Sequence, residues 1–375
     1  MPYAMSKTIE YNIKNINTLD TPALVIYQSG VKRNIEKLVA SIDDVTRLRP
    51  HIKTHKTKEV TKLLQQAGIQ KFKCATIAET ELLASCQAQD VLLAYQPVAK
   101  KLLRFIEIIK TFPDTKLSCL VDALPVAEEM SKIASENDIT LSVYIDLNVG
   151  MNRTGISPEN AFDLILSLQK TPSLKIEGLH IYDGHIHDAD IEIRKQKCNE
   201  YYPKVELLVA KLENEGIQNL NIVAGGTPTY PIHSQRETIE CSPGTFVYWD
   251  KGYQNLFQEQ DFEPSALVIS RVISLPDKDK ICLDLGHKSI AAENPLERRV
   301  FFLNAPNATF IGQSEEHLIL GVSENHSYKI GDIFYGLPIH ICPTCALYER
   351  AYIVEHENLT GEEWKIIARD RKISI

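Results

Sequence analysis

The sequence predicts an α/β protein in which a (β/α)8 TIM-type barrel precedes a domain made mostly of β-strands. From residue 22 to about residue 250, short runs rich in β-branched and aromatic residues alternate with stretches of helical spacing. Such alternation is typical of βαβ units and a parallel sheet. After residue 250 short β-type runs are separated by turn residues, with little helical spacing. We therefore expect a barrel over residues 22–250 and a β domain over residues 251–375.

The first region contains nine β-type runs, one more than an eight-stranded barrel needs. We place the first run outside the barrel, so that the run ending at Lys53 becomes the first barrel strand. A doubly wound open sheet is the alternative, but no Gly-x-Gly-x-x-Gly motif follows an early run. The nine runs are Ala23–Tyr27, Thr46–Lys53, Lys71–Ile77, Asp90–Tyr95, Lys116–Asp122, Leu141–Leu147, Leu174–Tyr182, Leu220–Ala224 and Thr238–Cys241.

Helical spacing between these runs is clearest over Lys101–Ile109 and Tyr202–Glu215. We expect the N-terminal segment, residues 1–21, to join the β domain, and the run at residues 23–27 is a candidate to join it as well. The strands expected in the β domain are Ala266–Leu275, Lys280–Leu285, His317–Val322, Asp332–Tyr335, Ala351–Glu355 and Glu363–Ala368.

Composition narrows the class of function. The 375 residues exceed one ordinary domain, and the net charge of −8 provides no basic field for nucleic acid or an anionic membrane. No apolar run reaches membrane-spanning length, and the eight cysteines are scattered as in reduced cytoplasmic proteins. We therefore expect a cytoplasmic protein with a small-molecule substrate and neither a nucleic-acid nor a membrane partner.

The first barrel run ends in a basic turn that reads Arg49-Pro50-His51-Ile52-Lys53-Thr54-His55-Lys56. A lysine must lose its proton before it attacks a carbonyl, and burial or neighbouring cations lower the lysine pKa from about 10.4. Barrel active sites lie at the carboxyl ends of strands. Lys53 is therefore the candidate for holding an aldehyde cofactor as a Schiff base. A solvated basic turn is the alternative interpretation.

A later run leads into a loop with an arginine between two turn glycines, Gly150-Met151-Asn152-Arg153-Thr154-Gly155. Arg153 can bind an anionic oxygen through two parallel hydrogen bonds. The spacing alone equally allows a helix-capping or salt-bridging arginine.

The next run carries His180 and Tyr182 and is followed by His185 and His187. If the strand persists, His180 and Tyr182 share one face. Three histidines and a tyrosine within eight residues favour a functional cluster over a structural one. The candidate roles are stacking on a cofactor ring and general base catalysis near neutral pH.

A glycine-rich loop follows the run at residues 220–224. Gly225 and Gly226 offer unhindered amides beside the Thr227 hydroxyl, and late-strand loops are the usual phosphate site of this barrel class. Gly244, after the next run, is a further candidate for this loop cluster. A glycine pair is weak evidence alone, because glycines also simply form turns.

In the β domain, His340 and Cys342 are separated by one residue. In an extended segment the two side chains point to the same side and offer two ligands for zinc. Two protein ligands leave positions open for substrate, which suits Lewis-acid catalysis. The alternative is that two buried cysteines, Cys342 and Cys345, lie near an incidental histidine.

Together these motifs resemble the D-threonine aldolase and D-serine dehydratase family of fold-type III pyridoxal phosphate (PLP) enzymes, which are related to alanine racemase. The similarity covers nearly the whole chain and is most specific at residues 49–56 and 340–344, while residues 150–155 resemble the arginine loop of alanine racemases. The resemblance implies that Lys53 holds PLP and that Arg153 contacts the ring substituents. It also implies that the loop at residues 225–227 binds the phosphate, and that His340 and Cys342 hold a divalent metal, Zn or Mn.

The resemblance has departures. The dehydratases of this family carry tyrosines where this chain has His180 and His187. Its aldolases tend to pair the metal histidine with aspartate, so that Cys342 is closer to the zinc-binding dehydratase pattern. The chain therefore stands between the two activities.

The expected function is a PLP- and metal-dependent lyase for β-hydroxy-D-amino acids. The preferred activity is that of a D-threonine aldolase. In this reaction His185 or His187 would act as the base for the hydroxyl proton. The alternatives are a D-serine or D-3-hydroxyaspartate dehydratase, then an amino-acid racemase. Two other classes of protein are possible. A metal-dependent hydrolase with a His185-x-His187 chelate would be colourless, whereas a pyridoxal imine absorbs visible light. A non-catalytic PLP carrier would not need the β domain. By analogy with fold-type III relatives, a homodimer is expected.

Overall fold

The computed structural model describes residues 11–375. This part of the chain divides into two compact units. The barrel unit contains residues 39–53, 58–244 and 370–375, and the sheet unit contains residues 11–38, 54–57 and 245–369. The chain therefore passes from one unit to the other several times, whereas a single boundary at residue 250 was expected.

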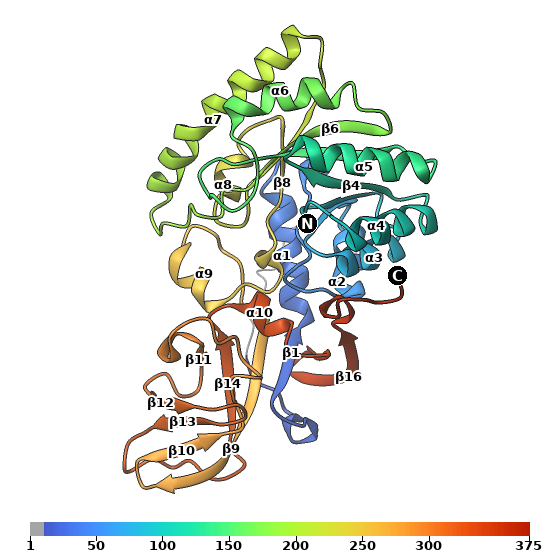
Figure 1. The fold of residues 1–375 in the computed structure, drawn as a ribbon. Helices are drawn as coiled ribbons and strands as arrows, with labels where there is room; N and C mark the ends of the chain where they lie inside the picture. Colours follow the sequence, from blue (N-terminus) through green and yellow to red (C-terminus); the bar gives the residue numbers. More distant parts are fainter. Residues whose placement is uncertain (1–10) are drawn as a thin grey trace, which may run out of the picture. The chain divides into compact units, whose positions relative to one another are not determined.

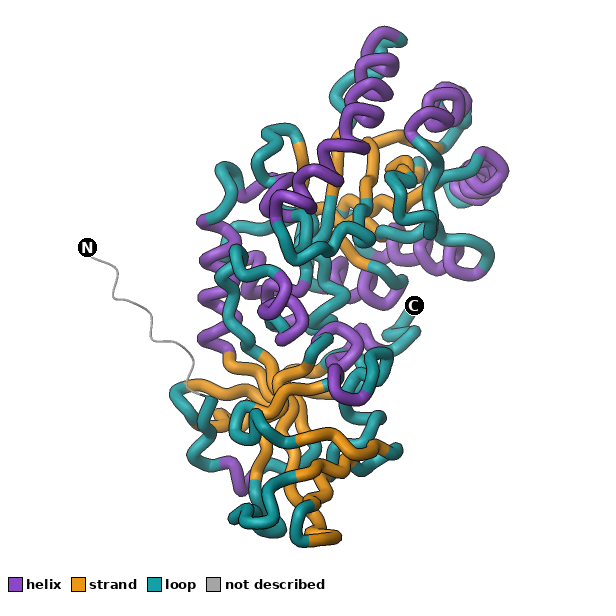
Figure 2. Tube along the Cα trace, turned by 90° about the vertical axis from the view of Figure 1, so that its left-hand side faces the viewer, coloured by secondary structure: helices purple, strands orange, loops and turns teal. Residues whose placement is uncertain are grey.

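The barrel unit is built on a parallel sheet of seven strands in the order β2-β3-β4-β5-β6-β7-β8. Helices lie on the outside of these strands (Figures 1 and 2), as expected for consecutive βαβ units. The strands are β2 Lys71–Cys74, β3 Asp90–Leu93, β4 Lys116–Val121, β5 Leu141–Leu147, β6 Leu174–Ile181, β7 Asn221–Ala224 and β8 Ile239–Cys241. The helices are α2 Lys58–Gln66, α3 Ile77–Ser85, α4 Lys100–Thr111, α5 Leu124–Glu136, α6 Pro158–Leu168, α7 Ile191–Asn214 and α8 Tyr230–His233.

The predicted first barrel strand is present as a bridged segment instead of a regular strand. The Arg49 amide donates to the Cys241 carbonyl of β8 at 2.8 Å, and the Ile52 amide donates to the Lys73 carbonyl of β2 at 3.0 Å. Pro50 has no amide hydrogen and interrupts the ladder, and residues 45–47 form a 3-10 turn. The α/β barrel-like architecture is confirmed, but the described chain shows seven regular strands where eight were expected.

Apolar side chains fill the space inside the barrel strands. Leu92 on β3, Leu120 on β4, Tyr144 on β5 and Val223 on β7 form one buried cluster. Because each comes from a different strand, this cluster is an interior layer of the kind that fills such barrels. The residues nearer the carboxyl ends of the strands lie above this layer, and they are where the predicted site residues occur.

The sheet unit contains a nine-stranded, mostly antiparallel sheet with the main order β12-β13-β10-β9-β1-β15-β16. β14 pairs with β9 and with β11. The strands are β1 Ala23–Tyr27, β9 Ala266–Asp277, β10 Lys280–Leu283, β11 Val300–Phe302, β12 Thr309–Gln313, β13 Leu318–Gly321, β14 Ile333–Pro338, β15 Arg350–Glu355 and β16 Asn358–Lys365. The helices are α1 Gln28–Ala40, which runs on into the barrel unit, α9 Lys251–Leu256 and α10 Ile341–Cys345. Short 3-10 turns occur at Ile16–Thr18, Val45–Arg47, Thr245–Val247, Leu296–Arg298 and Ile367–Arg369.

The placement of residues 23–27 outside the barrel is confirmed, since β1 pairs with β9 and β15 in this sheet. Residues 11–21 pack within the same unit, where Ile13 and Leu19 join a core cluster with Leu267 and Val354. Residues 1–10 of the predicted N-terminal segment lie outside the described residues.

The structure differs from the sequence-based expectations in three places. The strands β11 and β12 were not expected, because each is short and lies among turn residues. The helix α7 begins at Ile191, well before residue 202, and continues through Pro203, a residue that usually ends or kinks a helix. Residues 340–342 do not form one extended segment, because His340 is the extended N-cap residue of the short helix α10 and Cys342 lies in its first turn.

Candidate active site

A cavity of about 210 Å³ opens at the carboxyl ends of the barrel strands. Four of the predicted site residues line it: Lys53, Arg153, His180 and Tyr182. These residues come from separate parts of the sequence and meet because the ends of parallel strands lie at one edge of the sheet. The remaining lining residues are His51, Lys73, Ala75, Ala94, Leu120, Asp146 and Thr154.

Three cations surround the ring of Tyr182. The Nζ atoms of Lys53 and Lys73 lie 5.7 and 5.6 Å from the ring centroid, and the Arg153 Cζ lies 4.9 Å from it. These distances are within the range of cation–π attraction. The tyrosine therefore forms the centre of a positively charged cavity.

Lys73 on β2 is a cavity residue that the sequence interpretation missed. Its side chain is buried, with 2% of its surface exposed. Burial, followed by the positive charge of Lys53, lowers the pKa of Lys73 to about 7. A lysine with this pKa can gain or lose its proton near neutral pH.

His180 is held by an aspartate that was also not predicted. The His180 Nδ1 lies 2.7 Å from Oδ1 of Asp146, and the two residues are paired across β5 and β6. Burial acts to raise the pKa of Asp146, but the hydrogen bond from His180 holds it below its usual value. The charged carboxylate therefore fixes a proton on Nδ1, and the buried His180 Nε2 has no hydrogen-bond partner among residues 11–375.

The predicted glycine-rich loop is tightly built. Gly225 has a φ of +72°, and a Cβ atom there would lie 2.8 Å from Thr229 and His233. Larger residues would therefore be strained at this position. The Gly244 amide donates to the Thr227 hydroxyl at 3.0 Å, so the two predicted phosphate segments are in direct contact.

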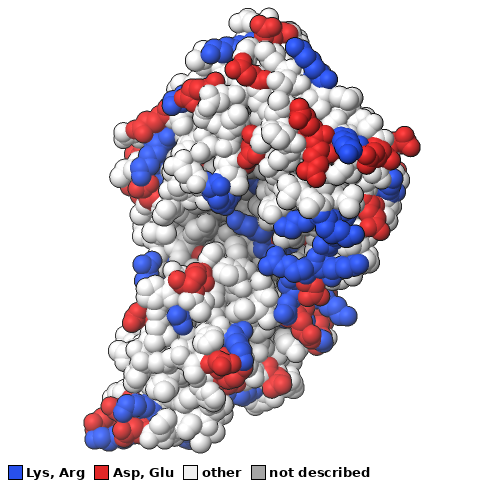
Figure 3. Space-filling model, in the orientation of Figure 1, with Lys and Arg blue, Asp and Glu red and all other residues white. Residues whose placement is uncertain are grey.

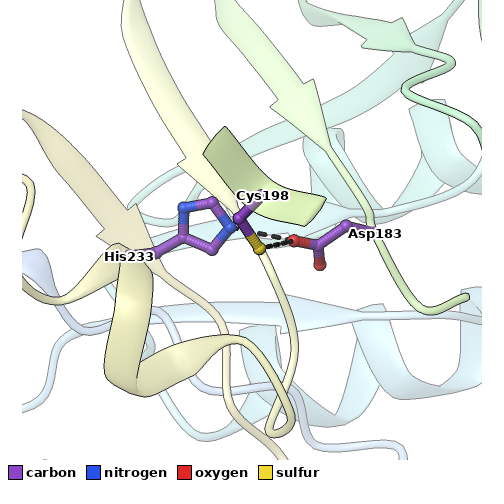
Figure 4. Close-up of side chains that lie close together, drawn as sticks. All are labelled: Asp183, Cys198 and His233. Atoms are coloured by element: carbon purple, nitrogen blue, oxygen red, sulfur yellow. Dashed lines mark hydrogen bonds and ion pairs between the residues drawn. The ribbon is translucent and has the colours of Figure 1, made fainter. Parts of the chain in front are cut away.

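A buried network anchors this loop to the end of β6. Asp183 accepts hydrogen bonds from the hydroxyl of Thr229 at 2.8 Å and from that of Tyr201 at 2.9 Å. The His233 Nε2 lies 2.9 Å from the same carboxylate, and the Cys198 thiol donates to it at 3.6 Å (Figure 4). Thr229 in turn accepts a hydrogen bond from the Gly226 amide at 3.3 Å. Asp183 therefore determines the position of the glycine loop.

Three members of this network, Asp183, Cys198 and His233, lie close enough together to ligate one metal ion. Their ligand types suit zinc. However, Thr229 and Tyr201 already donate to the Asp183 carboxylate, so a cation would have to displace donors that hold the loop. The geometry fits a hydrogen-bond network better than a metal centre.

The two predicted catalytic histidines are both exposed and neither lines the cavity. His185 lies against the arginine loop, since a Cβ at Gly150 would be 3.0 Å from its Nε2. His187 precedes Asp188, whose pKa is lowered mainly by its hydrogen bond and ion pair with Lys197. Of the two, His185 is closer to the loop that supplies Arg153.

The predicted metal ligands belong to the sheet unit and are near each other. The Cys342 thiol lies 3.1 Å from the Thr54 hydroxyl, and the His340 Nδ1 lies 2.7 Å from Glu293. Burial lowers the pKa of His340, but the hydrogen bonds to Cys342 and Glu293 outweigh it and raise it to about 9. Cys342 and Glu293 thus supply negative charge that would equally attract a divalent cation.

The cavity residues fit an anionic aromatic cofactor such as PLP. Lys53, Lys73 and Arg153 provide positive charge, while Asp146 is already hydrogen-bonded to His180. The unpartnered Nε2 of His180 is a buried polar atom that a bound ring could meet. Elsewhere on the surface both signs of charge occur (Figure 3).

The model of the alanine racemase N-terminal domain matches residues 26–251, and a serine dehydratase domain model matches residues 265–354. The chain therefore belongs to the alanine racemase N-terminal domain family, within the fold-type III enzymes. The predicted resemblance to D-threonine aldolases and D-serine dehydratases is confirmed, and this family assignment supports PLP as the cofactor.

Individual relatives include both types of lyase. The chain is 26% identical over 362 residues to D-threonine aldolase of an Arthrobacter species, covering 94% of this chain and 93% of that protein. It is 24% identical to D-threo-3-hydroxyaspartate dehydratase of a Delftia species, covering 88% and 93%. The crystal structure of D-threonine aldolase from Filomicrobium marinum matches with a TM-score of 0.86 at 22% identity, covering 97% and 99%.

Within the described chain, none of the helices combines the length and apolar character needed to cross a bilayer.

Proposed function

We propose that the protein is a PLP- and divalent-metal-dependent lyase that cleaves β-hydroxy-D-amino acids, with D-threonine aldolase activity as the first candidate. The observation that supports this most directly is the cationic cavity at the strand ends, which combines Lys53 with a buried His180–Asp146 pair. The whole-length similarity to a D-threonine aldolase narrows the substrate class.

Each side chain has a role in this proposal. Lys53 would hold the cofactor covalently, Arg153 would bind an oxygen on its ring, and Tyr182 and His180 would orient it. The loop of Gly225, Gly226 and Thr227, with Gly244, would bind the phosphate. When bound, PLP withdraws electrons from the Cα of an amino acid.

Carbon–carbon cleavage requires a base for the β-hydroxyl proton. We assign this role to His185 before His187, because His185 lies against the loop that carries Arg153. His340 and Cys342 would hold the divalent cation, whose charge favours loss of a proton from a hydroxyl group. The sulfur ligand favours Zn²⁺ over Mn²⁺.

The second candidate is a dehydratase for D-serine or D-3-hydroxyaspartate. The serine dehydratase domain match at residues 265–354 and the similarity to a hydroxyaspartate dehydratase favour it. In that reaction Lys53 would remove the α-proton, and the cation would help the β-hydroxyl to leave. A racemase comes third, because it needs a second base on the opposite side of the cofactor.

Product analysis separates the candidates. Purified protein loaded with PLP and Zn²⁺ or Mn²⁺ is given D-threonine or D-serine. Glycine and acetaldehyde from D-threonine would support the aldolase, whereas ammonia with 2-oxobutanoate or pyruvate would support the dehydratase. A Lys53→Ala variant that retained both the visible cofactor band and turnover would exclude the assignment of Lys53.

Two further measurements belong to this proposal. Removal of the cation with a chelator should abolish turnover, and metal content should fall in a His340→Ala variant but not in a His326→Ala control on the same unit. Sedimentation velocity tests the homodimer. A monomer with full activity would rule out a role for dimerisation.

A further inference from the structure

Lys73 connects the cavity to the glycine-rich loop. It lines the cavity with Lys53, and its Nζ donates to the Gly225 carbonyl at 3.4 Å. Gly225 begins the loop predicted to bind a phosphate, in which the Gly225 amide already donates to the Ile181 carbonyl and the Gly226 amide to the Thr229 hydroxyl. The backbone of Lys73 lies on β2, and its side-chain Nζ lies beside the loop that follows β7, on the inside of the barrel.

The charge of Lys73 lacks a direct counter-ion. Among residues 11–375 no carboxylate forms an ion pair with it, and Asp183 and Asp146 act on it through their charge without a hydrogen bond. Both are already engaged, Asp146 by His180 and Asp183 by the loop network around Thr229.

Burying an isolated ammonium group costs free energy, and this cost favours the neutral amine and lowers the pKa of the lysine. The lowered pKa of Lys73, about 7, is the expected response. A ligand that places negative charge beside the Lys73 Nζ would raise the pKa of Lys73 again. The phosphate of a bound cofactor carries that charge, and the Gly225 contact places the lysine Nζ at the loop where it would bind.

We propose that Lys73 binds the phosphate group of the cofactor, with its Nζ donating a hydrogen bond to a phosphate oxygen beside Gly225. This inference rests on the proposed function insofar as that function requires PLP. Lys73 on β2 would give the phosphate site a positive charge, which the glycine-rich loops do not supply.

The test uses ligands that bind without reacting with Lys53. Pyridoxine 5′-phosphate and pyridoxine differ only in the phosphate, and calorimetry gives the dissociation constant of each. A hydrogen bond to a charged group is worth about 1.5–3 kcal/mol, so Lys73→Met should weaken pyridoxine 5′-phosphate binding roughly 10- to 100-fold. Pyridoxine binding should change less than about threefold, because pyridoxine carries no phosphate for Lys73 to bind. Lys73→Arg should restore part of the loss.

Proton uptake gives a second readout. At pH 8 the lysine is mostly neutral before the ligand binds and should be protonated afterwards. Wild-type protein should therefore take up more protons than Lys73→Met when titrated in two buffers of different ionisation enthalpy. Lys101→Met removes an exposed lysine on α4 and should leave both the affinity and the uptake unchanged.

Equal losses for the two ligands would overturn the inference and place Lys73 at another part of the cofactor. Unchanged affinity of Lys73→Met for pyridoxine 5′-phosphate, with folding verified by circular dichroism, would also overturn it. These measurements involve no turnover. A protein that favours the phosphate ligand through Lys73 but forms no lyase product would therefore contradict the proposed function and leave this inference standing.

Discussion

The two ends of the barrel strands bury positive charge in opposite ways. Toward the amino ends, Arg49 is fully buried and forms two ion pairs, with Asp90 and with Glu240, each at 2.7 Å. Toward the carboxyl ends, Lys73 is buried without an ion pair among the described residues. A buried charge with partners supports the fold, whereas a buried charge without them is available to a ligand.

The amino-end ion pairs extend over several strands. Lys71 also contacts Glu240, and Lys116 pairs with Glu177 at 2.6 Å. Arg49 lies on the bridged segment that joins β8 to β2, so its two carboxylates fasten this segment where Pro50 weakens the backbone ladder. The irregular first strand is thus stabilised by charge at one end and supplies Lys53 at the other.

Arg49→Met should produce the largest loss of stability. Removing one partner of a buried ion pair typically costs about 3–5 kcal/mol, and this change leaves Asp90 and Glu240 without their common cation. Urea unfolding of the cofactor-free protein measures the effect, with the exposed Lys62→Met as control. A loss below about 1 kcal/mol would show that the two carboxylates find other partners.

The sequence predicted four of the residues that line the carboxyl-end cavity, but not the partners that hold them. Lys53, Arg153, His180 and Tyr182 were identified because each falls at the end of a strand-like run, and such ends converge. Lys73 was missed because Lys71-Phe72-Lys73 has the alternation of a strand with one face in water. Only closure of the sheet places that face inside the barrel.

Other misses have equally local causes. Asp146 is one of many acidic residues until the β5–β6 register places it opposite His180. Asp183 lies beside the histidines that were given a functional interpretation, whereas its partners, Tyr201 and His233, lie on the helices α7 and α8. Contacts between distant residues depend on register and closure, and a single sequence does not encode these in any local pattern.

Asp183→Asn should have an intermediate effect. The asparagine keeps the size of the side chain but directs an amide group at the donors Thr229 and Tyr201. A buried donor left unsatisfied costs about 1–3 kcal/mol, and the glycine loop should bind a phosphate ligand more weakly. Urea unfolding and pyridoxine 5′-phosphate affinity measure the two effects, with the exposed Asp163→Asn as control. If stability falls and affinity does not, the network supports the fold without positioning the loop.

Lys73→Met should cause no loss of stability in the cofactor-free protein, and its effect should depend on pH. Burial and Lys53 lower the pKa of Lys73 to about 7 in the folded state, while Asp183 and Asp146 act against the shift and Arg49 adds to it. Between about pH 7 and the ordinary lysine pKa the unfolded chain binds more protons, so the wild-type protein should gain stability as pH rises. The gain is at most about 1.4 kcal/mol per pH unit, and Lys73→Met should lack it. Parallel pH profiles for the two proteins would mean that Lys73 keeps its proton in the fold. The carboxyl end would then resemble the amino end, with a partner for every buried cation.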